Sequence, residues 1–153
     1  MTVSIRLPAT RALVSFGAAI LVIASFLYLG LVPNSTDTTQ SALTTSQTAL
    51  MFFGWVIFSP VLETVLLSAI FKIASNYLSV KSSAVLAASL LAAFHGLIWW
   101  AWPIIVFVPF LIFSIPFTQH SASIRSAIVS SALTHSFHNL YGFVGFIVVQ
   151  GMT

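Results

Sequence analysis

Long apolar stretches alternate with short polar segments along this chain, as they do in proteins that cross a membrane several times. Each stretch is close to the roughly 20 residues that an α-helix needs to span the hydrocarbon core of a bilayer. The pattern therefore predicts an all-α, polytopic membrane bundle of about five transmembrane helices. The predicted segments cover residues 12–32, 49–74, 84–102, 104–117 and 126–150.

Two of these segments admit a second interpretation. The first follows Arg6 and Arg11 and could be a signal peptide, but its apolar run is too long and no clear small-x-small cleavage site follows it. We therefore expect a retained helix. The fourth segment carries Pro109 and Pro116, so we expect it to be kinked or broken. The polar connection after it contains His120, which we expect to face water or lipid headgroups.

The composition favours lipid over water as the surroundings of the chain. Hydrophobic residues make up 59% of it and charged residues only 5%, whereas a soluble domain carries about 25% charged residues. The few cations lie at helix ends rather than on one face, so no nucleic-acid partner is expected. The chain has no Cys, which excludes disulfides and Cys nucleophiles. We expect residues 1–153 to form a single membrane domain.

The charges also predict an orientation. Lys and Arg are enriched in cytoplasmic loops. With five crossings and a cytoplasmic N-terminus, every basic residue lies inside, while Asp37 and the tryptophans at the end of the third segment lie outside. The basic residues are Arg6, Arg11, Lys72, Lys81 and Arg125.

Polar side chains interrupt three of the apolar segments. Glu63 lies in the second, His95 in the third, and His135 and Asn139 in the fifth. At about 1.5 Å of rise per residue from the nearest cytoplasmic Lys or Arg, all four occupy one layer in the middle of the bilayer. His135 and Asn139 share a helix face because they are i and i+4, and His138 lies on that face or at its border. Ionisable residues at membrane depth are costly and mark functional sites.

The sequences around these residues resemble the motifs of the CPBP family of intramembrane proteases, which includes the type II CAAX prenyl endopeptidases and the bacterial Abi proteins. The first motif, a Pro followed by EExxxR, resembles residues 60–69, in which Glu63 matches the first Glu. Thr64 and Ser68 replace the second Glu and the Arg. The second motif, which ends in His, resembles residues 91–95, and the third, HxxxN, resembles residues 135–139. The resemblance covers approximately residues 50–140, after one additional N-terminal helix.

The resemblance implies an intramembrane endopeptidase. Glu63 and His95 would hold and activate a water molecule, and His135 and Asn139 would donate hydrogen bonds to the developing oxyanion. The substrate would be a peptide or protein, prenylated in part of the family, and the location the inner membrane of a bacterium. Glu63, His95 and His135 are also ligands of the kind that a divalent metal such as zinc accepts, and the sequence leaves open whether a metal takes part.

Two other functions remain open at this point. The chain could be a non-catalytic membrane partner, such as a bacteriocin-immunity or scaffold protein that keeps the fold. The reason is that the uncharged Thr64 and Ser68 replace both the second Glu and the Arg of the first motif. The polar layer could also move protons or metal ions, since intramembrane Glu and His residues build such relays. Five short helices with one acid make a poor transporter unless they oligomerise.

Overall fold

The protein is described by a computed structural model that covers residues 6–31, 43–119 and 123–150. Every regular element in these residues is helical and none is a strand, which confirms the predicted all-α class. α2, the π-helical turn η1 and α3 follow one another without a break and form one long helix, Thr45–Ala74. The elements are α1 (Arg6–Tyr28), α2 (Thr45–Phe52), η1 (Phe53–Phe58), α3 (Ser59–Ala74), α4 (Val80–His95), α5 (Trp102–Thr118) and α6 (Ile124–Gln150).

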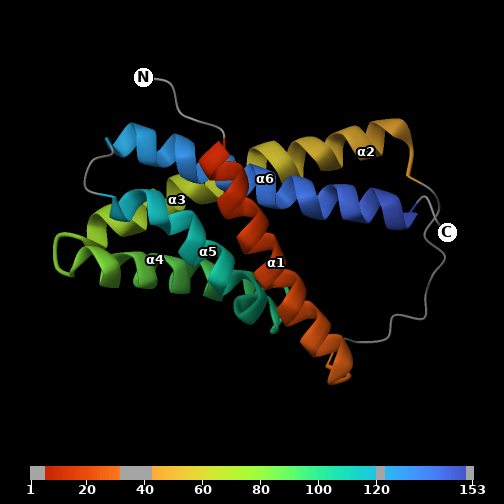
Figure 1. The fold of residues 1–153 in the computed structure, drawn as a ribbon, viewed down its shortest axis with the longest axis horizontal. Coiled ribbons are helices and arrows are strands. Elements are labelled where there is room, and N and C mark those ends of the chain that lie inside the picture. Colours follow the sequence, from red (N-terminus) through yellow and green to blue (C-terminus); the bar gives the residue numbers. More distant parts are fainter. Residues whose placement is uncertain (1–5, 32–42, 120–122, 151–153) are drawn as a thin grey trace.

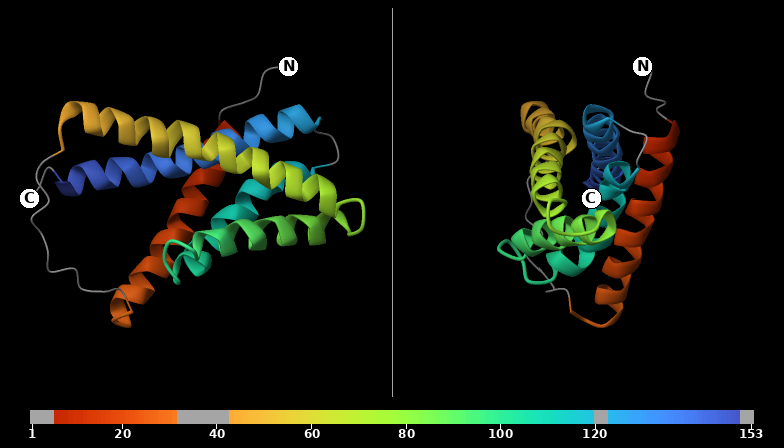
Figure 2. Two further views of the ribbon diagram at one scale, coloured as in Figure 1. Left: turned by 180° about the vertical axis from the view of Figure 1, so that it is seen from behind. Right: turned by 90° about the vertical axis from the view of Figure 1, so that its left-hand side faces the viewer.

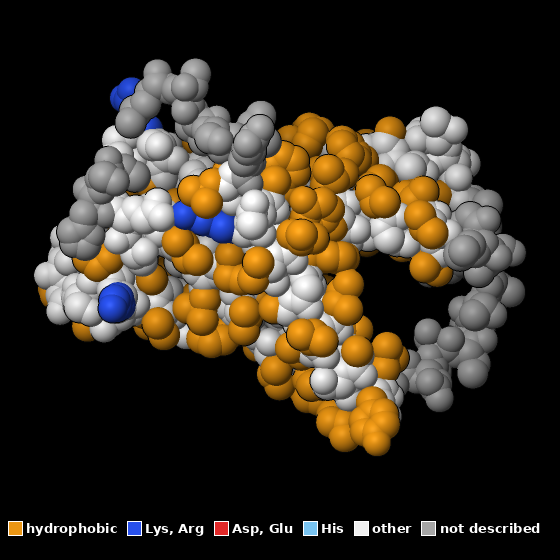
Figure 3. All heavy atoms as spheres, in the orientation of Figure 1, with side chains coloured by type: hydrophobic (Ala, Val, Ile, Leu, Met, Phe, Trp, Pro, Cys, Tyr) orange, Lys and Arg blue, Asp and Glu red, His pale blue; other side chains and the backbone are white. Residues whose placement is uncertain are grey.

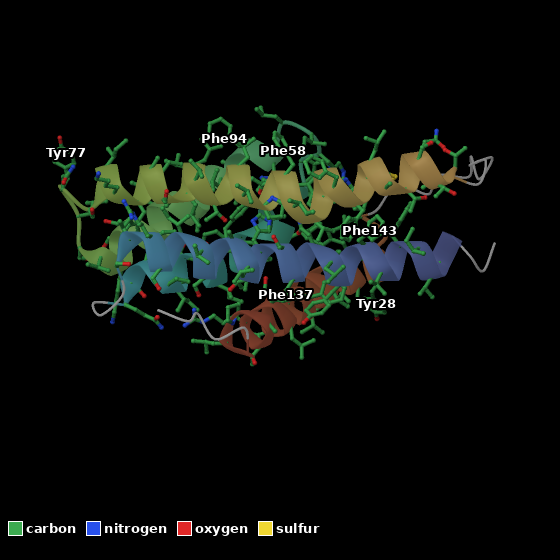
Figure 4. All side chains as sticks on the ribbon, turned by 90° about the horizontal axis from the view of Figure 1, so that it is seen from above. Tyr28, Phe58, Tyr77, Phe94, Phe137 and Phe143 are labelled. Atoms are coloured by element: carbon green, nitrogen blue, oxygen red, sulfur yellow. The ribbon has the colours of Figure 1, made fainter. Side chains whose placement is uncertain are left out.

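The helices form a layered bundle with α6 near its middle. The long α2–η1–α3 helix lies antiparallel to α6, and α1 crosses α6 on the opposite side (Figures 1 and 2). α4 and α5 are antiparallel neighbours that pack beneath this pair, and α5 also contacts α1 and α6. Figure 4 shows Phe143 between α6 and the long helix, whereas Phe58 and Phe94 point outward.

Small side chains let α4 pack closely against its neighbours. Ala84, Ala87, Ala88 and Ala92 are all buried on one side of α4, where small residues permit close approach of two helix backbones. The core that they join also contains side chains from α3, α5 and α6: Leu67, Phe71, Phe110, Phe113, Phe117 and Ala127. A second cluster joins α1 to the start of α5 through Ala19, Phe26, Ala101 and Ile105.

Most helix boundaries differ from the expected ones by a few residues, and the largest differences are at the end of α4 and at the start of α1. α4 ends at His95, not at Trp102. A Cβ on Gly96 would lie 2.9 Å from Pro103 Cγ, so glycine permits the close approach that turns the chain into α5. α1 begins at Arg6 and ends before Gly30, whose φ of +67° supports the hydrogen bond from Leu31 N–H to Phe26 O that closes the helix.

The fourth segment is continuous, so the expected break is wrong, while the expected kink stays a prediction. α5 runs from Trp102 to Thr118 as one helix and includes both Pro109 and Pro116. Both prolines are fully buried. Packing against α1, α4 and α6 therefore holds the helix together where two backbone donors are missing. The loop that contains Asp37 and the loop position of His120 lie outside the described residues.

Within the described residues, two helices are long and apolar enough to cross a membrane, namely Leu7–Tyr28 and Thr45–Ala74. Only 22% of each apolar window is buried inside the protein. α4 and α5 are apolar but shorter. On the face drawn in Figure 3, the Lys and Arg side chains in view lie in the half of the molecule that carries the α3–α4 turn, while hydrophobic side chains are in view in both halves.

Candidate active site

The carboxylate of Glu63 is the centre of a polar cluster contributed by three helices. Glu63 lies on α3, one turn after Ser59, whose hydroxyl donates a hydrogen bond to Glu63 Oε1. The other oxygen, Oε2, lies 3.7 Å from His95 Nε2 and 3.7 Å from His135 Nε2. The two carboxylate oxygens therefore differ: one is held by a hydroxyl, and the other faces two imidazoles.

His95 is the last residue of α4, and its ring is oriented by a contact one turn back on the same helix. His95 Nδ1 lies 2.8 Å from the carbonyl oxygen of Leu91. Since a carbonyl only accepts, Nδ1 carries the proton and donates it. In the neutral ring, Nε2 is then a lone-pair acceptor directed toward Glu63. Phe110 packs against the same ring, with the centroids 5.3 Å apart.

His135 is fixed by aromatic packing. It lies on α6 and is buried. The ring of Phe113 stacks on it with centroids 4.2 Å apart and planes 21° apart, and Phe110 meets it edge-on at 5.8 Å. Both phenylalanines belong to α5, so α5 holds the imidazole on α6 in its position beside Glu63.

Asn139 lies one turn beyond His135 on α6 and points toward the long helix. Its amide Nδ2 donates a hydrogen bond of 2.8 Å to the backbone carbonyl of Trp55 in η1. No direct contact with Glu63 is seen. Asn139 and Glu63 instead line the same cavity, so the four residues predicted from the sequence all face one space.

The N-terminal helix contributes to this site. Ser15 on α1 is fully buried, and its Oγ lies 2.9 Å from His138 Nδ1. Phe16 meets the His138 ring edge-on, with the centroids 5.8 Å apart. α1 therefore supplies one wall and ties itself to α6 through a hydrogen bond, although the motifs that suggested the site begin after it.

A cavity of about 420 Å³ connects these groups. Its polar members are Ser59, Glu63, His95, His135, His138 and Asn139, and most of the remaining lining is apolar or aromatic. The apolar lining comes from α1 (Phe16, Ala19, Ile20, Ile23), from η1 (Trp55) and from α5 (Trp102, Ile105, Val106, Pro109, Phe110, Phe113). A small polar cluster at one side of an apolar space is typical of a site for a largely apolar ligand.

Thr64 and Ser68, the two positions that depart from the family motif, form no hydrogen bond with the other polar groups of the site. Thr64 is buried, and its hydroxyl has no hydrogen-bond partner among the described residues. Ser68 Oγ donates to the carbonyl of Val65 on its own helix, at 2.8 Å. Among the described residues, neither hydroxyl forms a hydrogen bond with Glu63, so the polar contacts of Glu63 are made without them.

Sequence reasoning missed three groups of the site. Ser59 is i−4 from Glu63 and shares its helix face, a signal that was available but is weak because Ser is common in apolar helices. Ser15 lies on a helix outside the motifs. The carbonyl of Trp55 belongs to the backbone, and only the π-helical turn brings it to Asn139.

The metal expectation finds no support in the arrangement of side chains. Within residues 6–31, 43–119 and 123–150, no group of three or more His, Cys, Asp or Glu side chains is arranged to hold a metal ion. The imidazoles of His95 and His135 both approach one oxygen of Glu63, Oε2.

Known proteins give no family for this chain. No protein-family model, curated protein or solved structure matches it. The resemblance to CPBP proteases therefore rests on three short motifs, and the function must be argued from the geometry of the site.

Proposed function

We propose that the chain is a polytopic membrane protein in which all five continuous helices cross the bilayer. The support is the outer surface: large hydrophobic side chains are exposed on α1, on the α2–η1–α3 helix, on α4 and on α5. A core helix of a soluble protein is mostly buried, whereas only 22% of the apolar window is buried in each of the helices Leu7–Tyr28 and Thr45–Ala74. Lipid is the solvent that such a surface requires.

The proposed orientation places the N-terminus in the cytoplasm of a bacterial cell. α1 begins at Arg6, Lys72 lies in the last turn of α3, Lys81 in the first turn of α4, and Arg125 in the first turn of α6. These helix ends belong to one side of a five-helix crossing, as the positive-inside rule requires. The tryptophans around the α4–α5 turn then lie at the other interface, where Trp is enriched.

Within this membrane domain we propose an intramembrane endopeptidase. The observation that carries the proposal is the geometry of Glu63, with one oxygen held by Ser59 and the other 3.7 Å from two imidazole nitrogens at a cavity. A carboxylate and an imidazole acceptor that face the same space can bind the two protons of one water molecule. Such a pair supplies a general base for hydrolysis.

The proposed reaction uses the four predicted residues in two pairs. A water held between Glu63 and His95 Nε2 attacks the peptide carbonyl carbon, and its proton passes to Glu63. His135 and Asn139 donate hydrogen bonds to the resulting oxyanion, which such donors stabilise strongly in a water-poor site. When the C–N bond breaks, Glu63 returns the proton to the leaving amine. The aromatic lining favours an apolar residue beside the cleaved bond, and prenylated peptides belong to the candidate substrates through the family resemblance.

The experiment that tests this function compares new peptide termini in membranes that contain the wild type or Glu63→Gln at matched protein levels. Termini that depend on Glu63 would support proteolysis and identify a substrate. Asp37→Asn is the matched control, because Asp37 is the only other acidic residue of the chain, and it should cleave like the wild type. Equal termini from the wild type and Glu63→Gln, with both proteins inserted, would rule the protease out.

A second candidate is a non-catalytic membrane partner, such as an immunity or scaffold protein. The observation that favours it is the buried hydroxyl of Thr64, which has no hydrogen-bond partner in the described part of the chain and stands where the family motif has a charged residue. A non-catalytic role predicts that Glu63→Gln, His95→Ala and the double variant all retain the biological effect. Loss of the effect in each of them would exclude this candidate.

A further inference from the structure

The long helix is interrupted by a π-helical turn directly before Glu63. In η1 the N–H of Ser59 donates to the carbonyl of Gly54, five residues earlier. The next donor in this register would be residue 60, but Pro60 has no backbone N–H. The carbonyl of Trp55 therefore has no backbone donor within its own helix. The N–H at i+4 belongs to Ser59 and is directed to Gly54, and the residue at i+5 is Pro60, which has no N–H.

The missing donor comes from another helix. Asn139 Nδ2 lies 2.8 Å from the Trp55 carbonyl oxygen, although the two residues are 84 positions apart. The contact is supported by packing one turn farther along α6, where the rings of Phe143 and Phe146 lie 6.4 Å and 5.7 Å from the Trp55 ring. This packing sets the register of α6 against η1.

We propose that the backbone carbonyl of Trp55, freed by the π-turn and Pro60, is the positioning group for Asn139. The inference rests on the proposed function, in which Asn139 donates to the oxyanion. An Asn amide has two N–H donors. One is held by Trp55, which fixes the plane of the amide, and the second is then oriented for the oxyanion. π-turns inside α-helices often occur at functional sites, and this one provides an acceptor that a regular helix would not offer.

The contact itself can be measured without any catalytic activity. Trp55–Val56 is the only Trp–Val pair in the chain, so labelling with carbonyl-¹³C Trp and ¹⁵N Val gives a single HNCO cross-peak that reports the Trp55 carbonyl. We expect the carbonyl shift to move to lower frequency in Asn139→Ala, because a hydrogen bond to it is lost. Asn76→Ala, in the exposed α3–α4 turn, is the matched control and should leave the peak in place.

The effect on catalysis is tested by restoring the helical donor. Pro60→Ala supplies an N–H in the π register of the Trp55 carbonyl, so this carbonyl gains a donor within the helix that competes with Asn139 and changes the direction of their hydrogen bond. We expect kcat to fall about tenfold or more with KM little changed, since a misaligned oxyanion donor acts on the transition state. Pro116→Ala, at a second buried helix proline, is the control for a general effect of proline removal.

A double-variant comparison decides whether the two residues act together. In the Pro60→Ala background, Asn139→Ala should cause a much smaller further loss of kcat than in the wild type. Fully additive losses would overturn the inference, as would an unchanged Trp55 carbonyl shift in Asn139→Ala. If the wild type cleaves nothing, the proposed function fails, and the catalytic role of the Asn139–Trp55 hydrogen bond fails with it. The Trp55 carbonyl shift still establishes whether this hydrogen bond exists.

Discussion

At the scale of single residues, the site depends on the different surroundings of the two oxygens of Glu63. Ser59 donates to Oε1, and the imidazoles of His95 and His135 face Oε2. A carboxylate held at one oxygen cannot rotate freely, so its second oxygen keeps a fixed direction toward the cavity. In the proposed reaction this fixed direction is what aligns the base with a bound water, and alignment contributes strongly to rate.

Removal of the Ser59 hydroxyl should therefore slow cleavage without unfolding the protein. A hydrogen bond to a charged group is worth about 1.5–3 kcal/mol, so Ser59→Ala is expected to lower kcat roughly tenfold to hundredfold, measured in single-turnover assays. Ser59→Thr keeps a hydroxyl and should retain most of the activity. Ser68→Ala is the matched control because its hydroxyl bonds only to Val65 O, and an equal loss in that variant would contradict the role of Ser59.

The sequence was informative at residue scale where a polar side chain stands in an apolar surrounding. Glu63, His95 and His135 were found by that contrast, and the structure brings their side chains together. Asn139 was found by its spacing from His135, but its contact with a backbone carbonyl was not predictable. Every residue has a backbone carbonyl, so the sequence does not single one out as a partner. The Trp55 carbonyl is free to accept from Asn139 because of a π-turn, which hydropathy does not reveal.

At the scale of helices, hydropathy located the segments but not their ends. Trp99 and Trp100 are apolar and extend the predicted third helix, yet the backbone turns after His95. The reason is steric: the start of α5 packs against Gly96, where a Cβ would have no room beside Pro103. Hydropathy averages over side chains and does not register such a contact.

Gly96→Ala should consequently destabilise the protein. The added Cβ would lie 2.9 Å from Pro103 Cγ and 3.0 Å from Ala93 O, and overpacking of this kind costs about 1–3 kcal/mol. Gly17→Ala is the matched control: its Cβ meets nothing within 4 Å, and replacing a helical Gly by Ala stabilises by roughly 0.5–1 kcal/mol. Thermal unfolding in one detergent should show opposite shifts, and a lowered midpoint for Gly17→Ala alone would contradict this account.

At the scale of the whole molecule, the all-α bundle follows from the apolar pattern, while the arrangement of helices does not. The sequence gives no reason why α1 should pack beside α6, because the side chain buried there, Ser15, is polar, while the apolar Leu13 two residues earlier is exposed. The number of crossings also needs an experiment, since two helices pass the length and hydropathy criteria and α4 and α5 are shorter.

The absence of Cys allows a direct test of the topology. Asn76→Cys lies in the α3–α4 turn and Leu97→Cys in the α4–α5 turn, and five crossings place these turns on opposite sides. A membrane-impermeant maleimide added to intact cells should label Leu97→Cys and leave Asn76→Cys unlabelled until the cells are opened. Labelling of both in intact cells would show that α4 does not span the membrane, and the reverse pattern would invert the orientation.

The π-turn in the long helix also has a consequence for the gene. A π-turn holds one residue more than the α-helical turn that it replaces, so losing one codon within residues 53–58 should leave the faces of the flanking helix unchanged. A codon lost elsewhere in residues 45–74 would rotate one part of the helix against the other by roughly 100°. After deletion of Phe53 or Gly54, Pro60 would instead deprive the carbonyl of Val56 of its donor, on another face of the helix, and the Ser59 N–H would donate to Trp55. Such a deletion mutant should insert and fold, yet offer Asn139 no acceptor.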